Sequence, residues 1–198
     1  MATKQQNKIW LNILVDLVCS FIMQLLDLKE LEKESSERGI PIIGNKKGKW
    51  LLDKVKELKP KKILELGTAS GYSGIILGSE KGKLTTIEMD SKIAGEAEKN
   101  FKKFNINAKI TIGNANLEIK NIKEKFDLIY IDHAKKDYIK ILDNCIDLLN
   151  KNGVIIADNI FFEGCKNFKE KILEDKRLKT EIVDIEDGLS YSKMIEKV

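Results

Sequence analysis

Two short segments of the sequence carry the oxygen-bearing side chains that a hard metal ion prefers. Asp132 and the pair Asp158–Asn159 each follow a run of apolar residues. Two carboxylates and an amide oxygen suit Mg²⁺, with coordination positions left for water or substrate. Without a cation, neighbouring aspartates would repel each other. The alternative is that each aspartate only caps a following helix. Because both segments place an aspartate at the end of an apolar run, we favour the metal site.

A lysine, Lys135, follows Asp132 at a distance of one helical turn or less. Beside a divalent cation, a lysine that has lost its proton can act as a general base. Considered alone, Lys135 would be a surface lysine, as most lysines are.

A second set of residues indicates a cofactor that contains a nucleoside. Glycines at 67 and 71 precede a predicted helix, where the backbone can turn tightly and free N–H groups are available. Glu88 ends the next predicted strand, where an acidic side chain can accept hydrogen bonds from both ribose hydroxyls. Asn114, after the third strand, could bind adenine or equally well cap a helix. These features alone do not separate NAD from S-adenosylmethionine.

The elements that must position these residues alternate along the chain. Short apolar runs predict strands at Lys62–Leu66, Lys83–Glu88, Lys109–Ile112, Phe126–Ile131 and Gly153–Ala157. Helical spacing predicts helices at Lys46–Leu58, Tyr72–Ser79, Ser91–Phe104, Asn116–Lys120 and Lys136–Leu149. Glu181–Ile185 and Ser190–Ile195 predict an antiparallel hairpin at the sheet edge. The predicted fold is α/β: a Rossmann-like, doubly wound sheet of about seven strands with an extra N-terminal helix.

The N-terminal segment Ile9–Leu28 is mostly apolar and long enough to span a bilayer. Asn12, Asp16, Ser20 and Gln24 nevertheless recur at every fourth residue, and an Asp within a span is costly in lipid. We therefore expect a helix that packs on its own domain and on a second subunit, which predicts a homodimer and no membrane span. The alternative is a helix that packs only on its own core. The predicted division is an N-terminal helical segment, 1–38, and one domain, 39–198.

The composition excludes several classes of protein. The net charge of +4 over 198 residues is too small to require nucleic acid, and the basic stretch Lys46, Lys47 and Lys49 is predicted to be a solvated loop. Three separated cysteines and one histidine nearly exclude a zinc site. An odd, sparse cysteine count is typical of the cytoplasm, where thiols stay free.

The sequence resembles the cation-dependent O-methyltransferases, a family that includes catechol and caffeoyl-coenzyme A O-methyltransferases. The matching stretches are LELGTASGYS, TTIEMD, FDLIYIDHAKKDY, GVIIADNIFFEG and DGLSYSK. They occur in order from about Ile40 to the C-terminus, and the IDHAKKDY and ADN pair is the most specific part.

The resemblance implies roles for individual residues. Asp132, Asp158 and Asn159 match the metal ligands, and Lys135, together with Asp132, matches the catalytic group. The implied S-adenosylmethionine-binding residues are Ile43, Glu65, Gly67, Thr68, Gly71, Tyr72, Ser73, Glu88, Met89, Asn114, Ala115 and Asp132. Asn114 departs from the family, which often has Asp at that position.

The expected function is Mg²⁺-dependent transfer of a methyl group from S-adenosylmethionine to a hydroxyl of a catechol-like small molecule. One alternative acceptor is a hydroxylated uridine of transfer RNA. An alternative of another class is a non-catalytic nucleotide-binding or scaffold protein, against which the metal cluster and Lys135 argue. An NAD-dependent dehydrogenase is less favoured, because the spacing of the glycine loop differs.

Overall fold

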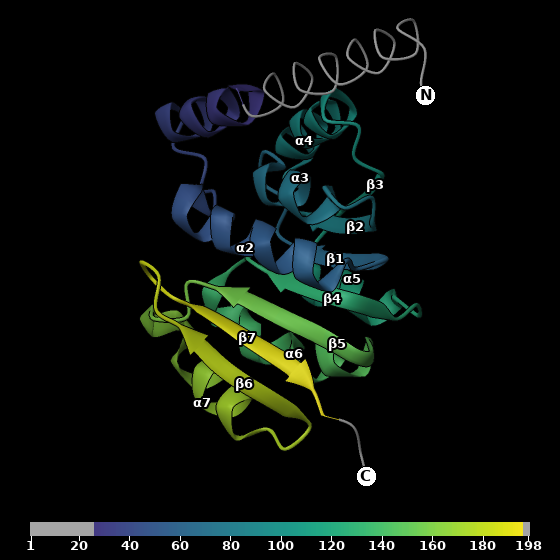
Figure 1. Cartoon of the computed structure of the whole chain (residues 1–198), viewed down its shortest axis with the longest axis vertical. Helices are drawn as coiled ribbons and strands as arrows, with labels where there is room; N and C mark the ends of the chain where they lie inside the picture. The colour runs from purple at the N-terminus through teal and green to yellow at the C-terminus, as the bar shows by residue number, and fades with distance from the viewer. Residues whose placement is uncertain (1–25, 196–198) are drawn as a thin grey trace, which may run out of the picture.

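One seven-stranded sheet organises the part of the chain that the computed structural model describes, residues 26–195. Its strands lie in the order β3-β2-β1-β4-β5-β7-β6, with β7 antiparallel to both of its neighbours and the other pairs parallel (Figure 1). The doubly wound α/β prediction, with its hairpin at the sheet edge, is confirmed. The strands are β1 Lys62–Leu66, β2 Lys83–Glu88, β3 Ala108–Ile112, β4 Phe126–Ile131, β5 Leu149–Asp158, β6 Leu178–Val183 and β7 Leu189–Met194.

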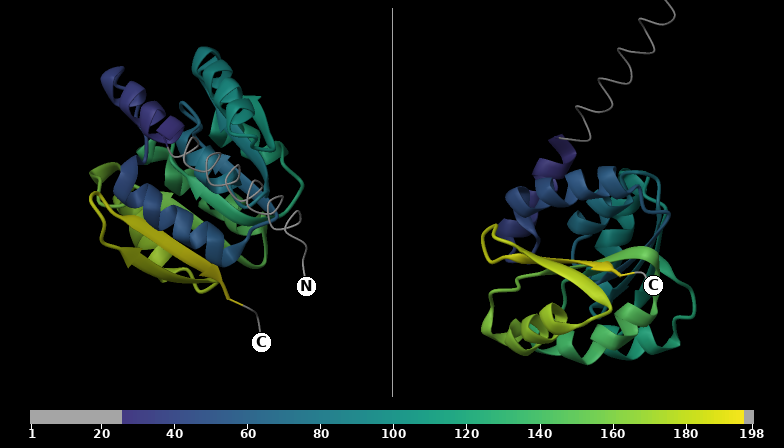
Figure 2. Two further views of the ribbon diagram at one scale, coloured as in Figure 1. Left: turned by 45° about the horizontal axis from the view of Figure 1, so that its top comes forward. Right: turned by 60° about the horizontal axis from the view of Figure 1, so that its bottom comes forward.

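Helices cover both faces of the sheet, as the right panel of Figure 2 shows. On one face lie α2 Gly44–Leu58, α3 Tyr72–Gly78 and α4 Ser91–Lys103. On the other lie α5 Ala115–Glu118, α6 Tyr138–Asp147 and α7 Lys166–Glu174. Short 3-10 turns at Ile119–Asn121, Lys135–Asp137 and Glu163–Cys165 lead out of α5 and into α6 and α7.

The apolar runs of the central strands explain this layering. In β4, Leu128 and Tyr130 pack under the first set of helices, whereas Ile129 and Ile131 pack under the second. All four side chains are fully buried. Because successive residues of a strand point to opposite faces, a strand covered on both sides must be apolar throughout. Each such side chain contributes about 1.5–3 kcal/mol of burial free energy.

The predicted elements and the structure differ most clearly in three places. The predicted helix Lys136–Leu149 gives way to a strand, because Leu149 pairs with Phe126 of β4 and begins β5. The helix α7 was not predicted. The hairpin strand β6 begins and ends earlier than Glu181–Ile185, because Ile185 belongs to the turn and its carbonyl accepts a hydrogen bond from Gly188.

Helix 26–37, before α2, is fastened to the domain rather than separate from it. Ser35 is buried and its Oγ lies 2.9 Å from Ser70 Oγ, in the loop before α3. Arg38 makes two hydrogen bonds to Glu96 of α4, at 2.8 and 3.0 Å. Within residues 26–195, no helix has the length and apolar character needed to cross a membrane.

Most of Ile9–Leu28 lies outside the described residues, so its role as a subunit interface stays a prediction. The division of the chain at residue 38 stays a prediction too.

Candidate active site

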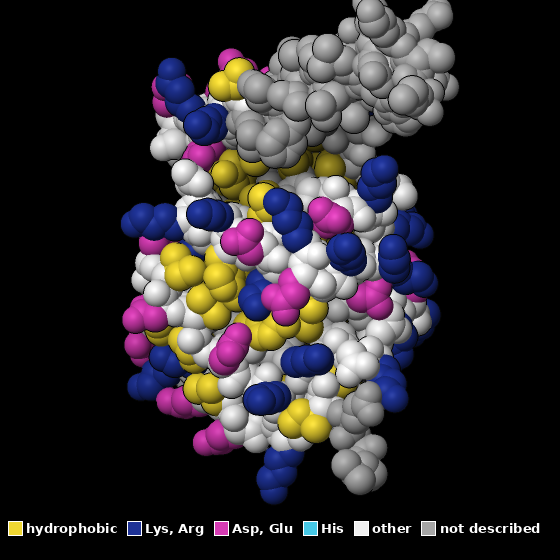
Figure 3. Space-filling view, viewed as in Figure 1, with side chains coloured by type: hydrophobic (Ala, Val, Ile, Leu, Met, Phe, Trp, Pro, Cys, Tyr) yellow, Lys and Arg dark blue, Asp and Glu magenta, His cyan; other side chains and the backbone are white. Residues whose placement is uncertain are grey.

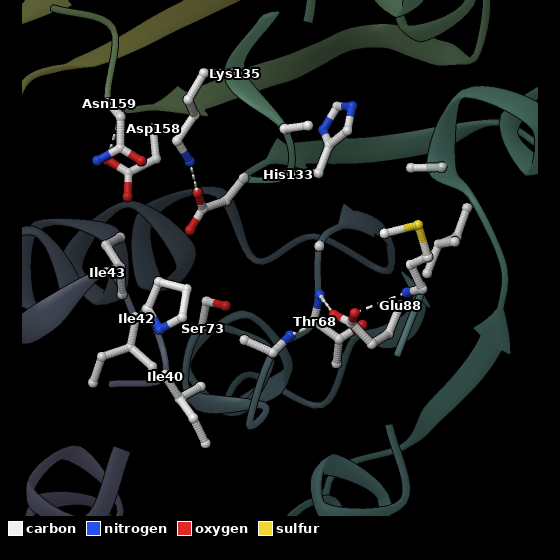
Figure 4. Close-up of a pocket in the computed structure, with 18 of the residues that line it drawn as sticks. Ile40, Ile42, Ile43, Thr68, Ser73, Glu88, His133, Lys135, Asp158 and Asn159 are labelled. Carbon is white, nitrogen blue, oxygen red and sulfur yellow. Dashed lines mark hydrogen bonds and ion pairs between the residues drawn. The ribbon is translucent and has the colours of Figure 1, made fainter. Parts of the chain in front are cut away.

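The carboxyl ends of β1 to β5 open into one cavity of about 1020 Å³. Figure 4 shows Thr68 and Glu88 at one end and Lys135, Asp158 and Asn159 at the other. Ligands of open α/β sheets bind at this edge. The cavity wall includes most of the predicted site residues: Ile43, Gly67, Thr68, Tyr72, Ser73, Glu88, Met89, Asn114, Ala115, Asp132, Lys135, Asp158 and Asn159. The structure places Glu65 and Gly71 outside this wall.

The glycine loop after β1 packs tightly against the loop after β4. Gly67 has a φ of +100°, and a Cβ at this position would lie 2.1 Å from the carbonyl oxygen of Asp132. No other residue type fits this approach without a shift of the backbone. The Gly67 N–H donates to Ile87, and the Asp132 N–H donates to Leu66. The loop after β1 and the loop after β4 are therefore fixed relative to each other.

Backbone N–H groups hold the Glu88 carboxylate on the cavity wall. Oε2 accepts hydrogen bonds from the N–H groups of Thr68 and Ala69, at 3.1 and 2.9 Å. Oε1 accepts from Met89 and Asp90, at 2.8 and 3.0 Å. A carboxylate has about four lone-pair positions, so its orientation is fully determined. Sugar hydroxyls at this end would share these oxygens with the loop. Met89 itself is 72% exposed, which leaves its side chain free to cover a ligand.

Glu65 lies beneath the loop and is fully buried. Its two oxygens accept hydrogen bonds from Ser73 Oγ at 2.6 Å and Thr86 Oγ1 at 2.7 Å. Burial raises the pKa of this carboxyl to about 8, although the two hydroxyl bonds oppose the rise. The group is therefore mostly neutral at pH 7. Glu65 supports Ser73 from below rather than facing the cavity.

The predicted contact of Asn114 with adenine stays a prediction. Asn114 lines the cavity, and its side chain also caps α5 by accepting a hydrogen bond from the Asn116 N–H at 2.9 Å.

Sequence reasoning gave no role to His133, which follows Asp132 directly. His133 Nε2 lies 3.2 Å from Asn116 Oδ1, and Nδ1 is buried with no hydrogen-bond partner among the described residues. Burial lowers the pKa of His133 to about 4, so the ring is neutral. The neutral imidazole stacks on the Tyr138 ring at the cavity wall, with 5.1 Å between the ring centroids. Its position directly after Asp132 was the only sequence signal that could have placed His133 at the site.

The prediction that Lys47 lies in a solvated loop was wrong. Lys47 belongs to the first turn of α2 and is only 3% exposed. It shares the buried face of that helix with Leu51 and Val55, at spacings of four residues. That spacing was the signal that could have revealed it. Its ammonium lies 2.5 Å from Asp158 Oδ1 and 2.5 Å from Asp187 Oδ1.

The two predicted carboxylate ligands are each paired with a lysine. Lys135 Nζ donates to Asp132 Oδ1 and to the Tyr138 hydroxyl, the latter at 3.2 Å. Asp158 is 1% exposed and is paired with Lys47. Burial and, next, the charge of Asp132 raise the pKa of Asp158 to about 6, while Lys47 opposes the rise. The charge of Asp132 thus opposes ionisation of Asp158, as is expected for neighbouring carboxylates without a cation.

The oxygen atoms of Asp132, Asp158 and Asn159 are the kind of ligand that a hard divalent cation prefers, but there are few of them. Among residues 26–195, no three His, Cys, Asp or Glu side chains form a metal-binding group. The predicted set has two carboxylates and the amide of Asn159. Because Asn159 Nδ2 donates to Asp187 Oδ2 at 2.5 Å, the amide oxygen is the atom left for another partner. Mg²⁺ commonly uses one or two carboxylates and keeps several waters, so this donor set is sufficient in kind.

Curated relatives of the chain include catechol O-methyltransferases. The protein of Bos taurus is 27% identical over 188 residues, covering 88% of this chain and 66% of its own length. Catechol O-methyltransferase B of Danio rerio is 31% identical over 170 residues, covering 76% of this chain and 64% of its own length. The chain thus spans just under two thirds of the length of these relatives.

A solved structure and a family model agree with these relatives. An O-methyltransferase of Bacillus cereus, solved in complex with SAH, superposes with a TM-score of 0.77 at 26% identity. The match covers 85% of this chain and 90% of that one. The family model described as O-methyltransferase matches residues 20–195. A match over most of the sequence, on a sheet whose strand ends carry the expected side chains, shows that the chain belongs to the O-methyltransferase family.

Proposed function

We propose that this protein transfers a methyl group from S-adenosylmethionine to a hydroxyl of a catechol-like small molecule, with Mg²⁺ or a similar cation at Asp132, Asp158 and Asn159. One observation carries the proposal: a single cavity joins the Glu88 end to the Asp158 end. A methyl donor at the first end and an acceptor at the second would lie in the same cavity, and positioning of this kind accounts for much of the rate of group transfer.

The cofactor end has the chemistry that a nucleoside requires. Glu88 offers carboxylate oxygens to ribose hydroxyls, and the neutral ring of His133 lines the cavity beside Asn116. Ser73, between the two ends in Figure 4, lines the cavity near the position expected for the methionine part. The solved relative in complex with SAH supports the same choice of cofactor over NAD.

At the acceptor end, Lys135 is the candidate base. Its ammonium already reaches Asp132 and the Tyr138 hydroxyl, so the side chain extends into the acidic region. A bound divalent cation would make an acceptor hydroxyl more acidic. Lys135 would take the hydroxyl proton of the acceptor, and Asp132 would accept a hydrogen bond from the protonated lysine.

The apolar part of the cavity wall favours a flat, partly apolar acceptor. Ile40, Ile42 and Phe162 line the cavity, and Phe162 is half exposed there. Two adjacent hydroxyls on a ring would suit a hard cation, with the ring lying against these side chains. The catechol O-methyltransferases among the relatives support this class of acceptor. On the face shown in Figure 3, basic side chains are mixed with acidic ones, a pattern unlike the basic stripe typical of RNA binding.

The direct test is methyl transfer from labelled S-adenosylmethionine to 3,4-dihydroxybenzoate, with guaiacol as the one-hydroxyl control. We expect transfer to the catechol with Mg²⁺, none in excess chelator, and recovery when Mg²⁺ is restored. Full activity in chelator would refute the metal part of the proposal. A label that enters transfer RNA and no catechol would refute the acceptor class.

A further inference from the structure

Lys47 is a buried cation inside the proposed metal site, and neither the metal ligands nor the base accounts for it. Its ammonium bridges the end of β5 at Asp158 and the β6–β7 turn at Asp187, both at 2.5 Å. The side chain of Lys47 is 4% exposed and that of Asp158 is 2% exposed. Buried charges of this kind persist only when they are paired.

The cluster has more negative than positive charge when no metal is present. Asp132, Asp158 and Asp187 supply three carboxylates, whereas Lys47 and Lys135 supply two ammonium groups. Asp158 Oδ1 also accepts the Asn159 N–H at 2.7 Å, and its other oxygen reaches Tyr130 only at 3.5 Å. Lys47 is therefore the principal counter-ion of Asp158.

We propose that Lys47 is a resident cation that competes with the divalent metal for Asp158 and so sets the metal affinity of the site. The inference rests on the metal part of the proposed function. A divalent cation bound by Asp158 would lie within a few ångströms of the Lys47 ammonium, where like charges repel strongly in a buried environment. Metal binding must then overcome this repulsion or move the lysine toward Asp187. Lys47 acts as a positioning residue through Asp158 and Asp187, not as a group that touches the acceptor.

A purely structural role for Lys47 makes the opposite prediction. If the lysine only fastened α2 to the strand ends, its removal would loosen Asp158 and weaken metal binding. If it competes, removal of its charge strengthens metal binding, because two buried carboxylates lose their counter-ion and a metal can replace it.

The test is calorimetric titration of the full chain with Mn²⁺, for wild type, Lys47→Met and Lys47→Arg. Methionine keeps the length without the charge, and arginine keeps the charge. Lys46→Met is the matched surface control, because the Lys46 side chain is 76% exposed and pairs with Glu186 at 3.6 Å. We expect Lys47→Met to bind Mn²⁺ at least about tenfold more tightly than wild type. Lys47→Arg and Lys46→Met should stay within about threefold of wild type.

A second readout uses thermal unfolding of the same proteins with chelator and with Mn²⁺. Lys47→Met should melt below wild type in chelator, and Mn²⁺ should raise its Tm more than that of wild type, since tighter binding to the native state gives greater stabilisation. If Lys47→Met does not fold in chelator, Lys47→Gln provides the same comparison. Rescue of folding by Mn²⁺ alone would support the proposal.

The outcomes separate this inference from the proposed function. Unchanged or weaker Mn²⁺ binding by Lys47→Met, with wild type binding normally, overturns the inference and leaves the proposed function intact. Binding by Lys47→Met but not by wild type supports the competition and contradicts metal use by the native protein. No binding by any of the four proteins refutes both.

Discussion

The buried carboxyl of Glu65 should make the stability of this protein fall as the pH rises from about 4.5 to about 8. Burial raises the pKa of Glu65 to about 8 in the folded protein, against 4.5 for an ordinary glutamate. In this window the folded state holds a proton that the unfolded chain has released, so the free energy of unfolding decreases with pH. At about 1.36 kcal/mol for each pH unit, the full effect is about 5 kcal/mol.

The substitution Glu65→Gln isolates this contribution, because glutamine has nearly the same shape and stays neutral at every pH. Its amide can still bond with Ser73 and Thr86, the two partners of the carboxyl. The variant should be less stable than wild type, or equal to it, near pH 5. It should gain up to about 5 kcal/mol relative to wild type by pH 8 to 9, since the wild-type protein must then ionise a buried group.

Urea denaturation at each pH from 5 to 9 measures the difference between the two proteins, in which the titration of all other groups cancels. Glu170→Gln, on the exposed side of α7, is the control and should show no such trend. A difference between wild type and Glu65→Gln that stays constant within about 1 kcal/mol across the range would show that Glu65 is ionised in the folded protein, and the reasoning would fail.

Four further predictions concern the site and the chain around it. Lys135→Ala should lower kcat by roughly 10²–10⁴-fold with cofactor binding unchanged in calorimetry, and Lys135→Arg should not restore it, because arginine keeps its proton. Lys136→Ala, one residue on and exposed, is the control, and activity near wild type in both Lys135 variants would remove that lysine from the mechanism. Glu88→Ala should weaken S-adenosylmethionine binding by about 1–3 kcal/mol for each ribose hydrogen bond lost, and equal affinity in calorimetry would contradict the assignment. Gly67→Ala should lower the free energy of unfolding by several kcal/mol in urea, because its Cβ would meet the Asp132 carbonyl oxygen at 2.1 Å; a small change would mean that the loop moves freely. A truncation that starts near Glu30 should abolish the predicted dimer and aggregate, whereas a monomeric full-length protein in light scattering would show that the N-terminal segment is no interface.

Secondary-structure elements whose signal lies in adjacent residues of the sequence were predicted well. The bounds of β1, β2 and β4 match the prediction residue for residue, because each is a short run in which Ile, Leu, Thr or aromatic residues predominate. The helix α7 was missed since only Phe168 and Ile172 of its nine residues are buried, which is a weak periodic signal. Similarly, the start of β5 at Leu149 depends on its pairing with Phe126, a partner more than twenty residues away.

The sequence by itself determined which side chains stand at the strand ends, because strand order along the chain and the rule for parallel sheets place Glu88, Asp132 and Asp158 at one edge. Only the tertiary structure decided the charge state and partners of that edge. It buried Lys47 against Asp158 and Asp187, 111 and 140 residues away, and it enclosed Glu65 beneath Ser73. The physical reason is that a pKa or an ion pair depends on which groups exclude water and which charges come within a few ångströms, and both are set by contacts between distant segments.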